Sequence, residues 1–593
     1  MPRRLTLSLA LLLFLAVAAP GAQAATFQVN DLTDRAAVAN ACVSVQPCSL
    51  REAIAAANGA AGADTVTLPA GTYGLTQGQL PAITGSTTIA GAGARSTVVN
   101  GNNASRVFSI EPSNASAVAF TDFTVTGGNA LVAAGGTSPG DGGGILVRGD
   151  NTTSLALNRM AVRGNSAQMG GGSLAAPPEN TGQAASTVSV SGSTFSNNTA
   201  GTGAMTDAQG GGMAVFGNLN LTNSTVSDNA ANSMATGRGA GIVVSTDTSN
   251  TTPVAATLVN STISNNTASA GAGMVTGAGG VSGVFGTTTV NATNTIVAQN
   301  TLNGVETDCS LVSAGAVVSN ISGDASCGFT GNGNKPQTSP QLGDLGDHGG
   351  PTDTRLLGTA SPALNAGTTA GCPGADQRGV ARPQAGACDI GAVELALPKV
   401  LTGAASRVFS TSAVLTGAVT NPPYGAATVA YELGRTTSYG TRLNSTDVAG
   451  GASGVRVARS PKLTPGVTYH YRIVATNRDG RSVGVDRTFK AVKKAGRKPY
   501  LKLAAVPKVC RRTSFTLRLR SRVSGTGVTL RSVKVTLDGR TLKTVKKSGR
   551  FAIKVDPGAL KGGRHTIRVV ATDSRRRTTT VVRRFSRCGA SKG

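Results

Sequence analysis

The stretch "TVSVSGSTFSNN", residues 187–198, decides the fold, because its pattern returns along the chain at a nearly constant interval. Valines stand ten and eight residues before Asn198, and Phe195 stands three residues before it. The two valine positions share one face of a strand, since side chains alternate between the two faces. Five asparagines serve as anchors of this pattern at spacings of 31 to 37 residues: Asn165, Asn198, Asn229, Asn266 and Asn300.

A glycine-rich turn and a second short apolar run follow most anchors, as in "GGGILV" from residue 142 and "GGGMAVF" from residue 210. Short strands at a fixed period, with Gly and Asn turns, predict an all-β right-handed parallel β-helix whose coils stack at ~4.8 Å. A β-propeller is disfavoured because each blade needs four strands. Asparagine and threonine should stack at the corners, and the predicted interior ladder is Val162, Phe195, Val226, Ile263 and Val297.

The segment "CSLREAIAAAN", residues 48–58, predicts a short helix that covers one end of the coil stack. Ser49 is a good N-cap, and Glu52 three residues later completes a capping box. Leu50 and Ile54 lie on the apolar face of this helix. Arg51 and Glu52 side by side are also candidates for catalysis, but no acid, base or nucleophile partner stands near them. The structural interpretation is therefore favoured.

Two longer motifs resemble domains of bacterial secreted β-helix proteins. Residues 30–73, "NDLTDRA…CSLREAIAAAN…GADTVTLPAGTY", closely resemble the CSLREA (CSLREAI) domain that begins such proteins. Residues 342–394, "LGDLGDHGGPTDTRLLGTASPALNAG…CPGADQRGVARPQAGACDIGAVE", closely resemble the choice-of-anchor Q domain that ends them. The resemblance implies an extracellular, surface-associated β-helix with a C-terminal attachment device. This chain lacks the sortase-type LPxTG motif found in some members.

Two sandwiches are expected after the β-helix. Residues 463–484 resemble the F strand and following turn of a fibronectin type III domain, with Tyr469 as the tyrosine-corner residue. Further alternating segments and an "LDGR" hairpin turn resemble a bacterial immunoglobulin-like sandwich. The expected organisation is a signal peptide (1–24), a CSLREA-type cap (25–64), β-helix repeats (65–335), a choice-of-anchor Q-like C-terminal cap (336–397), a fibronectin type III-like sandwich (398–492) and a basic immunoglobulin-like sandwich (493–593).

The first 24 residues predict export. Arg3 and Arg4 precede an apolar run, and Ala22–Gln23–Ala24 form a cleavage site. No other stretch is long and apolar enough to span a bilayer, so no transmembrane segment is expected after cleavage. Eight cysteines in an exported chain predict disulfides, paired here by proximity in sequence. The proposed pairs are Cys42 with Cys48, Cys309 with Cys327, Cys372 with Cys388 and Cys510 with Cys588.

A polysaccharide lyase or glycoside hydrolase is the alternative to a non-enzymatic protein, since some β-helix proteins have these activities. Hydrolysis needs two carboxylates roughly 5 to 10 Å apart across a groove. The candidates are Asp141, Asp150, Glu179, Asp207, Asp228 and Asp247. Only Asp228 occupies a register position shared by all copies, so no carboxylate ladder forms, and no catalytic residue is assigned. Four aspartates without EF-hand spacing, Asp31, Asp34, Asp344 and Asp347, are interpreted as loop-capping residues, and neither a metal nor a cofactor is predicted.

Charge is concentrated in the last domain. The whole chain carries a net charge of +27, and residues 493–593 hold 29 Lys and Arg against 3 Asp and Glu. Arg518, Arg520 and Arg522 are two residues apart and should project from one sheet face. The proposed polyanion-binding set is Arg518, Arg520, Arg522, Lys546, Lys547, Arg575, Arg576 and Arg577.

Three interpretations of this charge remain open: attachment to an anionic surface, a solubilising surface, or nucleic-acid binding. Attachment is favoured, to wall polymer, acidic polysaccharide or lipid headgroups; few aromatic residues and export argue against intracellular nucleic acid. We therefore expect a secreted or peripherally surface-associated, non-enzymatic protein. Its β-helix displays a binding face, and its basic domain holds it to an anionic envelope.

Overall fold

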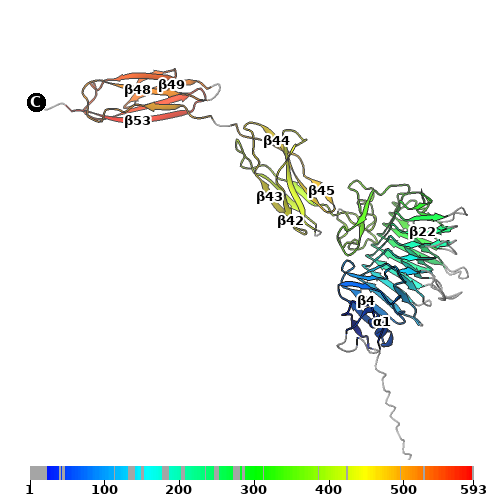
Figure 1. Ribbon diagram of the computed structural model, residues 1–593. Coiled ribbons are helices and arrows are strands. Elements are labelled where there is room, and N and C mark those ends of the chain that lie inside the picture. Colours follow the sequence, from blue (N-terminus) through cyan, green and yellow to red (C-terminus); the bar gives the residue numbers. More distant parts are fainter. Residues whose placement is uncertain are drawn as a thin grey trace, which may run out of the picture.

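The computed structural model describes residues 23–38, 42, 47–112, 114–130, 140–148, 153–176, 186–201, 207–233, 236–245, 253–270, 281–282, 288–310, 313–384, 386–422, 425–493, 496–524 and 528–589. Within these residues the protein is all-β with one helix, α1 (Leu50–Gly59). A domain of stacked parallel sheets comes first, and two β-sandwiches follow it in the chain (Figure 1). The predicted signal peptide falls almost entirely outside the described residues.

The parallel-sheet domain is built from four large sheets that the chain visits in rotation. The ten-stranded sheet contains, in spatial order, β1 (Thr26–Gln28), β2 (Asp64–Leu68), β4 (Thr87–Gly91), β7 (Ala117–Thr121), β11 (Ser154–Asn158), β15 (Ser186–Ser191), β20 (Gly217–Thr222), β25 (Val254–Val259), β29 (Thr288–Thr293) and β34 (Ser313–Val318). The nine-stranded sheet contains β3 (Gly71–Gly74), β5 (Thr97–Asn100), β8 (Thr124–Thr126), β12 (Ala161–Arg163), β16 (Thr194–Ser196), β21 (Thr225–Ser227), β26 (Thr262–Ser264), β30 (Ile296–Ala298) and β35 (Ile321–Ser322).

Two seven-stranded sheets and a short pair complete this domain. One contains β6 (Phe108–Ile110), β10 (Ile145–Val147), β14 (Leu174–Ala176), β19 (Met213–Val215), β24 (Ile242–Val244), β28 (Val281–Ser282) and β33 (Cys309–Ser310). The other contains β9 (Asn129–Ala130), β13 (Ser166–Ala167), β17 (Thr199–Ala200), β22 (Ala230–Ser233), β27 (Thr267–Ala270), β31 (Thr301–Leu302) and β32 (Val305–Glu306). The pair is β18 (Asp207–Gln209) with β23 (Thr236–Arg238).

Neighbouring strands in these four sheets lie one sequence repeat apart, except β31 and β32, which form an antiparallel hairpin. After β15 the chain passes through β16, β17 and β19, and it returns as β20 beside β15. In this parallel pairing Val188 aligns with Leu219 and Val190 with Leu221, in the register that the repeat predicts. The predicted interior ladder is also confirmed, since Val162, Phe195, Val226, Ile263 and Val297 are all fully buried.

Buried asparagines form a second ladder at one corner. The backbone N–H and the side-chain Nδ2 of Asn198 both donate to Oδ1 of Asn229, at 3.1 and 2.9 Å. Asn198 Nδ2 also donates to the carbonyl of Val162. The same bonds recur from Asn165 to Asn300, so the predicted asparagine stack is present, and it ends on the carboxylate of Asp308.

The residue before each anchor has a left-handed backbone. Its φ is 62° at Gly164, 55° at Asn197, 61° at Asp228, 56° at Asn265 and 65° at Gln299. Glycine and asparagine, and to a lesser degree aspartate, tolerate this conformation best. The left-handed backbone at this position gives a structural reason for Asp228.

Helix α1 covers the N-terminal end of the stack. Ser49 is its N-cap, and Ser49 and Glu52 form the predicted capping box. Leu50 and Ile54 are buried in the same core as β1 and β2. Arg51 pairs with Asp34 at 2.7 Å, and Glu52 pairs with Arg35 at 2.8 Å, so both candidate catalytic side chains have structural partners.

The C-terminal end of the stack is closed by residues 319–335 rather than by residues 336–397. Phe329 is 1% exposed and joins the interior core, together with the Cys309–Cys327 disulfide. Residues 336–397, expected as the end cap, instead lie along the outer face of the nine-stranded sheet. They reach back as far as Arg95, which pairs with Asp353 at 2.8 Å.

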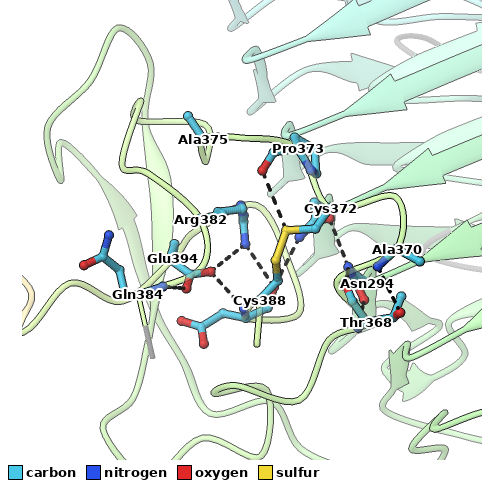
Figure 2. The surroundings of a disulfide bond; sticks show 12 residues. Asn294, Thr368, Ala370, Cys372, Pro373, Ala375, Arg382, Gln384, Cys388 and Glu394 are labelled. Carbon is cyan, nitrogen blue, oxygen red and sulfur yellow. Dashed lines mark hydrogen bonds and ion pairs between the residues drawn. A yellow bond between two sulfur atoms is a disulfide. The ribbon is translucent and has the colours of Figure 1, made fainter. Parts of the chain in front are cut away.

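This lateral position has a physical cause. The outer face of the last strands of the nine-stranded sheet carries Ile296, Ala298 and Ile321, which are fully buried. Leu357, on the hairpin β36 (Leu342–Gly346) and β37 (Thr354–Leu357), and Ile390 cover them. Figure 2 shows the neighbouring Cys372–Cys388 disulfide.

Polar bonds hold the same segment in place. Buried Arg382 pairs with Glu394 at 3.0 Å. Asn294 of the stack exchanges hydrogen bonds with Thr368 (Figure 2). The segment is therefore packed against the side of the stack by both apolar and polar contacts.

The first sandwich contacts residues 336–397. One sheet contains β38 (Lys399–Thr402), β39 (Leu415–Thr420) and β43 (Val455–Arg459). The other contains β40 (Ala427–Gly434), β41 (Thr441–Arg442), β42 (Thr446–Val448), β44 (Thr468–Asn477), β45 (Gly480–Val483) and β46 (Arg487–Lys490). Tyr469 makes the predicted corner, its hydroxyl accepting from the Thr464 N–H at 3.0 Å. Asp479 joins buried Arg378 at 2.6 Å.

The second sandwich has a three-stranded and a four-stranded sheet. The three-stranded sheet contains β47 (Tyr500–Leu503), β48 (Phe515–Arg522) and β51 (Gly549–Val555). The four-stranded sheet contains β50 (Arg540–Val545), β49 (Leu530–Leu537), β52 (Gly563–Asp573) and β53 (Thr578–Arg587). Cys510 and Cys588 tie its two ends together, and all four disulfides have the predicted pairing.

Candidate polyanion-binding site

Strand β48 separates its apolar and basic side chains cleanly. Leu517 and Leu519 point into the sandwich core and are 1% and 3% exposed. Arg518, Arg520 and Arg522 alternate with the buried positions and are exposed. The three arginines therefore share the outer surface of the three-stranded sheet, as the two-residue spacing predicts.

The neighbouring strands add cations to this surface in register. Lys502 of β47 and Arg550 of β51 both align with Arg520, from opposite sides. Side chains directly opposite in antiparallel strands have Cβ atoms roughly 4.5–5.5 Å apart, so three positive charges stand in one row. Together with Lys554, which lies opposite Thr516, the exposed cations define the basic face: Lys502, Arg518, Arg520, Arg522, Arg550 and Lys554.

Two adjoining grooves hollow this surface. The first, of about 510 Å³, is walled by Lys502, Arg518, Arg520 and Arg550, and small side chains such as Ala504 lie between them. The second, of about 540 Å³, lies between Arg522 and the chain entering the domain, and it shares Arg520 with the first. No Asp or Glu lines either groove.

The positive charges of the basic face have no acidic partner within the described residues. The three aspartates of this domain are engaged elsewhere. Asp538 pairs with His565 at 2.6 Å, Asp573 pairs with Arg577 at 2.8 Å, and Asp556 accepts from the Gly558 N–H. Like charges directly opposite each other on a sheet lower its stability, so an external anion would relieve this row.

The other predicted polyanion-binding residues lie at the end of the sandwich where the chain enters. Lys546 and Lys547 are exposed in the turn between β50 and β51, and Arg575 and Arg576 are exposed between β52 and β53. The strand register puts both turns at the Arg522 end. Arg577 departs from the prediction: it is half-buried and pairs with buried Asp573, so it stabilises its own turn.

Sequence reasoning missed several members of the site. Lys502, Arg550 and Lys554 belong to strands far from β48 in sequence, and only the sheet register brings them beside it. Arg497 and Lys498 line the second groove together with exposed Tyr500. The signal available in the sequence was the density of Lys and Arg, which does not show which of them share a face.

Of the carboxylates considered for catalysis, the two whose side chains the structure describes, Asp141 and Asp228, each have other partners. Asp150, Glu179, Asp247 and the side chain of Asp207 lie outside the described residues. Asp228 pairs at 2.7 Å with Arg355, which belongs to the lateral segment, residues 336–397. Asp141 accepts from the Gly170 N–H, and burial raises the pKa of its carboxyl.

Three of the four aspartates considered as metal ligands have other partners. Asp31 accepts from Thr33 and pairs with Arg35, and Asp347 pairs with Arg95. Asp34 binds Arg51, while Asp344 is exposed. Within the described ranges, no three His, Cys, Asp or Glu side chains gather as a metal site would require.

Comparisons with known proteins give structural similarity alone. No family model matches the chain, and no curated protein matches it. Among solved structures, the chain is similar to fibronectin(III)-like modules of Clostridium thermocellum CbhA, at 18% identity and a TM-score of 0.15, over 33% of this chain and 96% of that one. It is also similar to a two-domain fibronectin type III segment of chicken tenascin, at 14% identity and a TM-score of 0.16, over 32% and 98% of the two chains.

Proposed function

We propose that this is a secreted or peripherally surface-associated, non-enzymatic protein whose basic C-terminal sandwich attaches it to an anionic polymer of the cell envelope. The observation that carries the proposal is the basic face, with six exposed cations on three paired strands and no acidic partner within the described residues. The parallel-sheet domain is then the part of the molecule that is displayed for binding.

The proposed form of the displayed domain is a right-handed parallel β-helix. Its support is the parallel pairing of strands one repeat apart, the rotation of the chain through four sheets and the buried ladders between coils. The resemblance of residues 30–73 and 342–394 to the CSLREA and choice-of-anchor Q domains points the same way. Four disulfides are compatible with an extracellular site, as is the predicted signal peptide. In the described part of the chain, no helix has the length and apolar character of a membrane span.

Attachment by the basic face depends on many weak charge pairs. Arginine donates two parallel hydrogen bonds to a carboxylate or phosphate, and lysine supplies a point charge. Such exposed pairs are screened by salt, because the Debye length falls from ~10 Å at 0.1 M to ~3 Å at 1 M. Binding through this face should therefore be reversible and depend strongly on ionic strength.

The test is fractionation of cells that export the full chain. At low salt the protein should sediment with the envelope, and about 1 M NaCl should release it without detergent or wall-digesting enzymes. Changing Lys502, Arg520 and Arg550 to Glu should move the protein into the medium at low salt. A chain ending at residue 492 should appear there as well.

A matched variant separates position from total charge. Arg531, Lys534 and Arg568 are exposed on the four-stranded sheet, and changing them to Glu alters the net charge by the same amount. This control should remain on the envelope nearly as well as the unmodified chain. If the control and the Lys502/Arg520/Arg550 variant leave the cells equally, the basic face is not the attachment site and only the overall charge matters.

A further inference from the structure

We propose that the polymer held by the basic face is an acidic polysaccharide whose sugars carry carboxylates, and that Tyr500 stacks against one of its sugar rings. This inference rests on the proposed function and adds the chemical class of the ligand. Its basis is the second groove, where an exposed aromatic ring stands among cations.

Tyr500 lines this groove and faces solvent. It is directly opposite Arg522 in the strand register and is 51% exposed. Arg497 and Lys498 precede it and line the same groove. In the described part of the chain its hydroxyl has no hydrogen-bond partner, and the one guanidinium placed over an aromatic ring is Arg472 over Tyr439, in the other sandwich. The ring of Tyr500 is therefore open to a ligand.

The two grooves together form a track for one chain of sugars. They meet at Arg520, so a linear polymer can pass from one to the other without leaving the basic face. Seven cations line the two grooves, and five of these are arginines. Guanidinium groups match carboxylates with two parallel hydrogen bonds, which favours a carboxylate on the ligand.

The aromatic ring adds a requirement that charge alone does not. A tyrosine presents an apolar face together with a polar hydroxyl, and a sugar ring has an apolar C–H face bordered by hydroxyls. A polymer without rings, such as polyphosphate, leaves the face of Tyr500 uncovered. A ring-containing polyanion therefore fits the second groove better than a simple phosphate chain.

Single-stranded nucleic acid also combines rings with negative charge, but the site fits it less well. Proteins that bind it stack successive bases on several aromatic side chains along a basic groove. Here the grooves contain one exposed ring, because Phe551 packs against the sandwich core. Nucleic acid is accordingly the competing outcome of the test.

The experiment measures Kd of the full chain for four polymers at about 0.1 M salt: polygalacturonate, its methyl ester, polyphosphate and single-stranded DNA. Polygalacturonate should bind, and its uncharged ester should not. Tyr500→Ala should weaken polygalacturonate binding about 5- to 10-fold, the size of one aromatic contact, and change polyphosphate binding less than about twofold. Tyr500→Phe keeps the ring and should retain most of the affinity.

The possible failures are distinguishable. An equal loss for polygalacturonate and polyphosphate on Tyr500→Ala would overturn the sugar-stacking role. Tighter binding of single-stranded DNA, with greater dependence on Tyr500, would assign the groove to nucleic acid instead. In both cases the proposed attachment through the basic face survives. If the Lys502, Arg520 and Arg550 to Glu variant binds every polymer as well as the unmodified chain, the proposed function and this inference fail together.

Discussion

The asparagine ladder and the basic face both repeat one residue type across neighbouring strands, with opposite consequences. An asparagine side chain contains a donor and an acceptor, so each copy satisfies the next, as between Asn198 and Asn229. An arginine or lysine side chain contains only donors, so Lys502, Arg520 and Arg550 cannot satisfy one another. The first repetition completes its hydrogen bonds inside the protein, and the second leaves them for a partner outside it.

The largest expected effect comes from removing donors from the ladder. In Asn229→Asp, one carboxylate oxygen still accepts from Asn198, but the other faces the carbonyl of Phe195 and Oδ1 of Asn266, both acceptors. A buried carboxylate with one oxygen facing only acceptors should lower the free energy of unfolding by about 4–5 kcal/mol at pH 7. Denaturant unfolding of the full chain measures the loss.

The control for this change is Asn220→Asp. Asn220 lies in the same domain but is exposed, so its carboxylate stays hydrated. Its effect should be below about 0.5 kcal/mol. Equal losses for the two variants would show that the ladder does not depend on the donor–acceptor pairing described here.

A charge placed at the apolar end of the stack should be almost as harmful. Ile54 is 1% exposed on the buried face of helix α1, and it belongs to the apolar core that the helix covers. Ile54→Asp should destabilise the parallel-sheet domain by about 3–4 kcal/mol, through lost burial and an unpaired carboxylate. Thermal unfolding should show the change, and half-buried Ala55→Asp in the same helix should be milder. An unchanged melting temperature for Ile54→Asp would mean that the helix does not cover the core.

The ladder was predictable from the sequence because it depends only on the recurrence of the repeat. Once the anchors align, equivalent residues must meet in neighbouring parallel strands, and the places of Phe195 and Asn198 follow from this alignment alone. The capping box of Ser49 and Glu52 was also readable, since both residues act within one helical turn. Local chemistry and a constant period thus carry this part of the fold.

The basic face and residues 336–397 were less predictable, because neither follows from local chemistry or from the repeat. The partners of Arg520 come from strands about 20 and 30 residues away, and their alignment depends on register in a sheet with unequal loops. Residues 336–397 carry a long motif, but the motif does not show which of the parallel sheets it covers. The pairing of buried Arg355 with Asp228 and that of Arg577 with Asp573 likewise depend on tertiary contacts.

The end of the ladder should respond to pH. Asp308 is fully buried, and burial raises the pKa of its carboxyl to about 7, against hydrogen bonds from Asn300 that lower it. The unfolded chain loses this proton near pH 4, so the stabilising contribution is complete below pH 4 and is lost as pH rises through about 7. We expect a total fall of about 4 kcal/mol from this group, of which about 1.4 kcal/mol comes between pH 6 and pH 8.

Urea unfolding of the full chain at pH 6 and pH 8 tests the assignment. Burial also raises the pKa of Asp389, to about 6, so that group contributes mainly below the measured range. Asp308→Asn cannot titrate, and the difference in unfolding free energy between the two pH values should shrink in that variant whatever its absolute stability. A pH dependence identical to that of the unmodified chain would assign the effect to another group.

The smallest expected effect has the opposite sign and tests the basic face in the absence of ligand. Arg520→Thr removes the middle charge of the row between Lys502 and Arg550, so the second sandwich should become more stable by about 0.5 kcal/mol. Arg568→Thr is the matched control, because Arg568 is equally exposed on a strand but lies opposite Thr536 and Val582. Both changes gain the same strand preference of threonine, and the difference between them isolates the repulsion.

That difference should shrink at about 1 M NaCl, where the charges are screened. Added polygalacturonate should reverse it by stabilising the unmodified chain more than the Arg520 variant. If the two variants have equal stability at low salt, water and ions already screen the repulsion within the row. The unpaired charges of this face would then give no evidence for a ligand.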